Sequence, residues 1–115
     1  MIEIIRQDSK KIKVTIKDGN DPYDITGGTV FFTVNQNGDP ENDDDAVIRL
    51  KTGDPQVVVI DAEQGRVDIN LTSNDTDISP RRYYYDVQLV DAVGNVVSRK
   101  RDTFSVNPDI TRSLI

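Results

Sequence analysis

The sequence predicts an all-β domain, an immunoglobulin-like antiparallel sandwich of about seven to eight strands. Apolar side chains recur at every second position in several short segments, as in Val67-Asp68-Ile69-Asn70-Leu71. Turn sequences rich in Gly, Pro, Asp and Asn separate these segments. No window has the 3.6-residue periodicity of an amphipathic helix. Alternation with a period of two places one face of each strand on a core and the other in water.

Eight strands are expected, with boundaries defined to within ~2–4 residues. They cover residues 2–6, 10–18, 29–36, 46–51, 57–60, 66–72, 82–90 and 95–107. A hairpin connection is predicted over residues 91–95, where Gly94 accepts a positive φ. Residues 73–79 predict one short helical turn before Pro80, opened by an Asn or Ser cap. We therefore expect a single domain over residues 1–107 and a C-terminal tail over 108–115.

Composition argues against most catalytic chemistry. The chain has 115 residues, with no Cys and no His, so disulfides, thiolate nucleophiles and the commonest general base and metal ligand are missing. We expect a protein that is not an enzyme and that has no catalytic residues, no cofactor and no bound metal.

The net charge of −6 argues against nucleic-acid binding. Apolar runs fall short of the ~20 residues that cross a bilayer, and the N-terminus lacks signal-peptide features, so we expect synthesis in the cytoplasm.

Two acidic groups could supply oxygen ligands to calcium. The segment 39–45 is rich in carboxylates but lacks the register of an EF-hand, so we interpret it as a solvated loop. Asp18, Asp21 and Asp24 surround Pro22, and aspartates recur in such turns because their side chains bond to turn backbone. We interpret this second group as turn residues as well.

The basic run Arg99-Lys100-Arg101 has two interpretations. It could bind an acidic partner, a sugar phosphate or nucleic acid, or it could protect an edge strand, because basic side chains block pairing between sheets. Strict alternation along the last strand points Lys100 to the core. We therefore expect either a bulge near residues 99–102 or an edge location. Edge protection is the favoured interpretation.

Three consecutive tyrosines begin the seventh predicted strand. In Greek-key sandwiches a tyrosine at this corner bonds back to nearby backbone, and one of the three is predicted to do so. Alternation sends Tyr83 and Tyr85 to the core and Tyr84 outward. An outward tyrosine suits a contact surface, and Tyr23 is the corresponding candidate in a loop. The predicted interaction surface consists of Tyr23, Tyr84, Arg99, Lys100 and Arg101.

Several segments together resemble a known family. They are IRQDS (5–9), PYDITGGTV (22–30), DAEQGRV (61–67), YYYDVQL (83–89) and GNV (94–96). Their order resembles that of short phage and prophage structural proteins with immunoglobulin-like folds. It is also similar to the N-terminal domain of phage upper baseplate proteins. The resemblance covers nearly the whole chain and departs from the family after Pro80, where Arg81-Arg82 stands near a usual glycine.

The resemblance implies a structural role in a phage or prophage particle, as a tail, baseplate or other virion component. The expected partners are other virion or assembly proteins, with self-association into a homo-oligomer as a further expectation, and the expected location is the virion. The alternative is a binding module for host-surface carbohydrate or protein. That alternative would use the loops at one end of the sandwich, where Tyr23 is the aromatic candidate.

Overall fold

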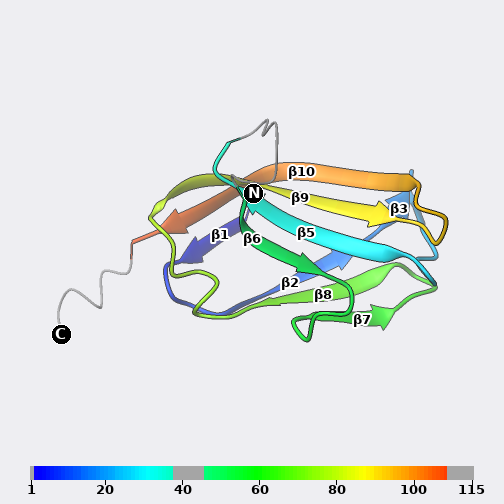
Figure 1. Cartoon of the computed structure of the whole chain (residues 1–115), viewed down its shortest axis with the longest axis horizontal. Helices are drawn as coiled ribbons and strands as arrows, with labels where there is room; N and C mark the ends of the chain where they lie inside the picture. The colour runs from blue at the N-terminus through cyan, green and yellow to red at the C-terminus, as the bar shows by residue number, and fades with distance from the viewer. Residues whose placement is uncertain (1, 38–45, 109–115) are drawn as a thin grey trace.

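Ten strands and no helix form in the residues that the computed structural model describes, 2–37 and 46–108 (Figure 1). They are β1 (Ile2–Ile5), β2 (Lys10–Thr15), β3 (Lys17–Asp18), β4 (Asp21–Pro22), β5 (Thr29–Asn35), β6 (Ala46–Lys51), β7 (Val57–Asp61), β8 (Arg66–Leu71), β9 (Arg81–Val90) and β10 (Val96–Asn107). Each of the eight predicted strands is present. The described residues contain no helix long and apolar enough to cross a membrane.

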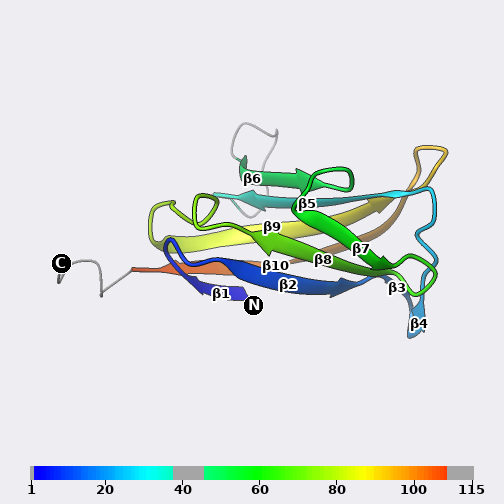
Figure 2. The ribbon, with the colours of Figure 1, turned by 90° about the horizontal axis from the view of Figure 1, so that it is seen from below.

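Eight of these strands form two stacked sheets, and β3 and β4 form a separate two-stranded ribbon (Figure 2). The order is β1-β10-β9-β5-β6 in the five-stranded sheet and β2-β8-β7 in the three-stranded sheet. All pairs are antiparallel except β1 with β10. Strands β2, β8 and β7 correspond to B, E and D of an immunoglobulin sandwich, and β5, β9 and β10 correspond to C, F and G. The predicted immunoglobulin-like sandwich is therefore confirmed.

The core lies between the two sheets and follows the predicted alternation. The rings of Phe32 and Tyr85 stack with centroids 5.9 Å apart. The largest wholly buried side chains come from both sheets: Phe32, Phe104, Ile69, Leu71, Leu89, Val30, Val34 and Val67. Burying a large apolar side chain contributes ~1.5–3 kcal/mol, so these residues supply most of the stability of a chain without disulfides.

The second predicted strand, 10–18, is interrupted at Ile16. The Ile16 N–H donates to the carbonyl of Gly65 at 2.8 Å, while the Ile16 carbonyl accepts from the N–H of Tyr23 at 3.0 Å. The chain thus leaves β2 and enters the short ribbon of β3 and β4. Gly65 has φ +69°, and a Cβ there would lie 2.6 Å from the carbonyl oxygens of Ile16 and Tyr23. This crossing requires glycine.

The predicted turn between β8 and β9 is present, but its cap is Thr72 and not an Asn or Ser. The Asp75 N–H donates to Thr72 Oγ1 at 3.2 Å, and Asp75 Oδ2 accepts from the Thr72 N–H at 2.9 Å. This reciprocal pair is a capping box. The buried hydroxyl of Thr76 donates to the carbonyl of Asp8 at 2.8 Å, so the turn is tied to the segment that follows β1.

The predicted tyrosine corner is confirmed at Tyr83. Its hydroxyl donates a 2.6 Å hydrogen bond to the carbonyl of Ser79, four residues earlier. The guanidinium carbon of Arg81 lies 5.3 Å from the centre of the Tyr83 ring. Tyr83 and Tyr85 are buried and Tyr84 is exposed, as the alternation predicts.

Candidate functional site

The outer face of the five-stranded sheet carries a row of polar side chains set by strand register. Thr103 of β10 lies opposite Tyr84 of β9, and Tyr84 lies opposite Asn35 of β5. The inward neighbours of these residues fill the core, so the same alternation that builds the sandwich presents this row outward. We name the region around this row the outer-sheet hollow.

A second row lies beside the first. Arg101 of β10 is opposite Asp86 of β9, Asp86 is opposite Thr33 of β5, and Thr33 is opposite Arg49 of β6. Arg101 Nε and Asp86 Oδ2 are 3.8 Å apart, a cross-strand ion pair at a partly exposed position. The hollow encloses about 260 Å³. It is lined by Asn35, Asn37, Tyr84, Tyr85, Asp86, Arg101, Asp102 and Thr103.

Asn35 is the least expected member of this site. The residue is 9% exposed, and its Oδ1 has no hydrogen-bond partner among the residues that the structure describes. An unsatisfied buried polar group costs ~1–3 kcal/mol. A donor brought by a ligand would recover that free energy. Tyr84 adds an exposed aromatic surface and Arg101 adds a cation, two residue types that are enriched where interfaces are strong.

Burial keeps the adjacent phenol neutral. Desolvation raises the pKa of Tyr85, and the negative charge of Asp102 raises it further. At neutral pH the Tyr85 hydroxyl therefore stays protonated. The hollow combines the amide of Asn35, the exposed phenol of Tyr84 and an ion pair, which suits recognition through shape, hydrogen bonds and stacking.

The structure brings together two of the predicted site residues, Tyr84 and Arg101, in the outer-sheet hollow. Lys100 lies on the other face, opposite Val87, where it borders a separate hollow beside residues 14–17 at the open side of the sandwich. The backbone of Arg99 pairs with Gln88, and its side chain falls outside the described part.

Of the two explanations for an inward Lys100, the edge location is confirmed. β1 pairs with β10 only from Phe104 onward, so the preceding part of β10 has β9 alone as its neighbour among the described strands. The alternative explanation, a bulge near 99–102, does not apply, because the register shift between β10 and β9 lies between Val96 and Ser98. The side chain of Lys100 can therefore extend past the open edge of β10 into solvent, and it is exposed.

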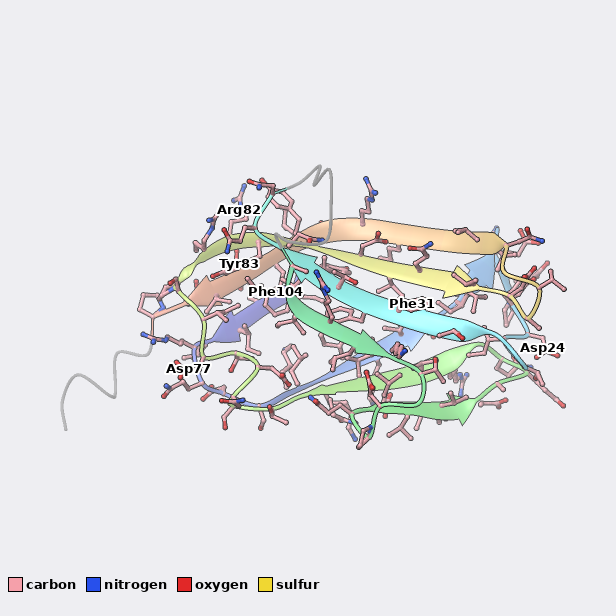
Figure 3. The ribbon with its side chains drawn as sticks, in the orientation of Figure 1. Asp24, Phe31, Asp77, Arg82, Tyr83 and Phe104 are labelled. Carbon is pink, nitrogen blue, oxygen red and sulfur yellow. The ribbon has the colours of Figure 1, made fainter. Side chains whose placement is uncertain are left out.

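Tyr23 lies in the loop end of the sandwich. It borders a hollow of about 240 Å³ with Asp24 and the connection 91–93. Figure 3 shows Asp24 at the opposite end of the molecule from Tyr83, where β9 begins. Tyr23 packs half-buried against the core. The structure therefore does not join Tyr23 to the outer-sheet hollow.

In the acidic turn around Pro22, Asp24 makes the predicted bond from an aspartate side chain to the backbone of the turn. Asp24 Oδ1 accepts from the Thr26 hydroxyl at 2.6 Å and from the Thr26 N–H at 3.0 Å. These bonds lower the pKa of Asp24. Within residues 2–37 and 46–108, no group of three or more acidic side chains could hold a metal ion. The other acidic segment, 39–45, lies outside the described residues.

Sequence reasoning missed Asn35 and Asp86 as site residues. The alternation of β5 already placed Thr33 and Asn35 on the face away from Val34, so a signal for an outward row was present. What the sequence lacked was the pairing of β5 with β9, which brings Asn35 beside Tyr84.

Comparisons with known proteins add little. No protein-family model and no curated protein matches the chain. Among solved structures, murine CRIg is similar with a TM-score of 0.43 and 11% identity, over 94% of this chain and 91% of that one. The assignment of the sandwich therefore rests on the strand order and pairing of this chain.

Proposed function

We propose that this chain is a non-enzymatic interaction protein that docks on other protein subunits through its outer-sheet hollow. The observation that carries the proposal is the buried, unpartnered Oδ1 of Asn35 beside exposed Tyr84 and Arg101. None of the described residues donates a hydrogen bond to that oxygen, and a backbone N–H of a partner would supply one. A protein surface supplies such donors together with carboxylates for Arg101.

The setting we propose is a phage or prophage particle, with virion or assembly proteins as partners. The order of segments that resembles phage structural proteins supports it, together with the immunoglobulin-like topology that the same resemblance implies. Particle components work by repeated docking, and a rigid sandwich with a preformed outer face suits that task because little ordering is needed on binding.

Particle purification tests this proposal. Particles are prepared by density gradient from the bacterium that carries the gene, and the chain is quantified by mass spectrometry. We expect a fixed ratio of this chain to the major particle proteins. The double substitution Tyr84→Ala with Arg101→Ala should remove it from particles, and Lys13→Ala, on the other sheet, should not. Particles that lack the wild-type chain would refute the proposal.

A second candidate is recognition of host-surface carbohydrate or protein by the loop end. The hollow that Tyr23 shares with Ala92 and Val93 favours it, because an aromatic ring beside small apolar groups suits a sugar face. Binding on a glycan array that disappears with Tyr23→Ala would support this candidate. Binding unchanged by that substitution would remove it.

A further inference from the structure

Strand β7 forms an unprotected edge of the three-stranded sheet. It pairs with β8 on one side and with none of the other described strands on its second side. Three consecutive side chains of this strand are exposed: Val58 by 42%, Val59 by 39% and Ile60 by 56%. An exposed apolar edge is a template for pairing with another strand.

The edges formed by β2, β6 and the open part of β10 carry basic residues that oppose such pairing, whereas β1, the remaining edge, reads Ile-Glu-Ile-Ile and has none. β2 contains Lys10, Lys11 and Lys13, and β6 contains Arg49 and Lys51. The open part of β10 carries the basic run around Lys100. β7 reads Val-Val-Val-Ile-Asp and has no basic residue. Proteins commonly block an edge with lysine, and β7 and β1 are the two edges without one. β1 exposes the charged Glu3, whereas the exposed run of β7 from Val58 to Ile60 is wholly apolar.

The pairing of β7 with β8 fixes which backbone groups point outward. The Asn70 N–H donates to the carbonyl of Gln56 at 2.8 Å, and antiparallel bonding alternates along the strand. Val58 therefore bonds toward β8, opposite Asp68, whereas Val57 and Val59 direct their backbone groups to the open side. The Val57 N–H donates to the carbonyl of Asp54 at 3.1 Å. The N–H of Val59 and the carbonyls of Val57 and Val59 remain for a new strand.

We propose that β7 pairs antiparallel with β7 of a second copy of this chain, about a two-fold axis at Val58. The Val59 N–H of each copy donates to the Val57 carbonyl of the other, and the three-stranded sheets join into one sheet of six. This dimer goes beyond the proposed function. It also uses a different sheet from the outer-sheet hollow, so either can fail without the other.

Charge and shape favour a second copy as the occupant of this edge. In the proposed register, Val58 meets Val58 and Val57 meets Val59, which joins apolar side chains across the axis. Asp61, the one charged residue of β7, lies opposite Pro55, so no carboxylate faces another. The irregularity between Val59 and Asp61 falls beyond the central pairs. A strand such as β2 could not pair with itself in this way, because its lysines would meet.

Cysteine crosslinking tests the register directly, since the chain has no cysteine of its own. Val58→Cys places the thiols on directly opposed residues, whose Cα atoms would be ~4.5 Å apart, within disulfide reach. Ile60→Cys is the matched control, because its side chain is more exposed but the two copies would be offset by ~14 Å along the strand. We expect a disulfide-linked dimer for Val58→Cys alone. No crosslink, or equal crosslinking of both variants, would overturn the proposal.

Sedimentation equilibrium supplies a second readout. We expect the wild-type chain to sediment at twice its mass of 12.9 kDa, and Val58→Lys to sediment as a single chain. Val58 is exposed and faces Asp68, so the lysine should leave the circular dichroism spectrum of the folded chain unchanged. The melting temperature should fall only by the amount that dimerisation contributes, and that difference should shrink as the protein is diluted. Val93→Lys, at an 81% exposed site outside β7, should remain dimeric. A wild-type chain that stays monomeric at high micromolar concentration contradicts the proposal.

Discussion

Asn35 and Tyr84 lie directly opposite each other on β5 and β9, one 9% and the other 37% exposed. The buried amide has an oxygen without a partner, and the exposed phenol borders the same hollow. The pair therefore joins an unmet hydrogen-bond acceptor to an accessible aromatic surface. A buried amide such as that of Asn35 lowers the free energy of unfolding of the free chain. In the proposed docking, its oxygen would accept a hydrogen bond from the partner.

Asn35→Val tests whether this amide is kept for binding. Valine removes the unsatisfied oxygen from a buried strand position, so we expect the free energy of unfolding to rise by ~1 kcal/mol. Chemical denaturation of both proteins measures this change. The same variant should dock less tightly in particles. A loss of stability instead would mean that the amide already makes bonds that hold the fold.

Tyr83→Phe tests the corner between β8 and β9. The substitution removes the hydroxyl that bonds to Ser79 and leaves the buried ring in place. We expect a loss of ~1 kcal/mol, and a melting temperature lower by ~4–8 °C, because a buried hydroxyl-to-carbonyl bond is removed. Tyr84→Phe, one residue further on and exposed, should melt within a degree or so of the wild type. Equal effects of the two substitutions would contradict the corner.

Alkaline pH should lower the free energy of unfolding by ionising the buried tyrosines. Burial raises the pKa of Tyr83, against an opposing effect of the Arg81 charge, and burial followed by the Asp102 charge raises that of Tyr85. A tyrosine whose pKa is higher in the folded chain than in the unfolded chain adds to the free energy of unfolding. This contribution is complete below the pKa in the unfolded chain, ~10, and is lost as the pH rises through the pKa in the folded chain.

An absorbance titration of phenolate formation checks this expectation. Tyr83 and Tyr85 should ionise above the ordinary tyrosine value of ~10, at a pH where the fold also begins to lose stability. Tyr83→Phe should remove one late-ionising group. If Tyr83 and Tyr85 ionise at the ordinary tyrosine value while the chain remains folded, they are not desolvated as described.

Gly65→Ala tests the crossing that ends β2. Gly65 and Gly19 both have positive φ, at +69° and +63°, so alanine is strained at either position. Only at Gly65 does the added Cβ also meet the carbonyl oxygens of Ile16 and Tyr23. We expect Gly65→Ala to cost ~1–3 kcal/mol more than Gly19→Ala, in line with other overpacked sites. Equal losses in denaturation experiments would show that the crossing can relax.

The strands could be predicted because their cause is local. Polar and apolar residues alternate throughout β8 and, in β9, from Tyr85 to Leu89. The burial of the side chains follows that alternation from Val67 to Leu71 and from Tyr83 to Leu89. The tyrosine corner was also predictable, since Ser79 and Tyr83 are close in sequence and the turn before the strand is marked by Pro80.

What the sequence could not specify depends on residues that are distant along the chain. The break at Ile16 comes from hydrogen bonds to Gly65, and the exposure of Lys100 comes from where β1 begins to pair with β10. The outer-sheet hollow has the same origin. Asn35 and Arg101 enter one site only because β9 lies between their strands.

Site-specific photocrosslinking within assembling particles tests docking through the outer-sheet hollow most directly. A photoreactive amino acid replaces Tyr84 in one variant and Lys13, exposed on the opposite sheet, in another. We predict that position 84 crosslinks to one particle protein and that position 13 does not. Crosslinks from position 13 with none from position 84, in particles that contain the chain, would contradict the account.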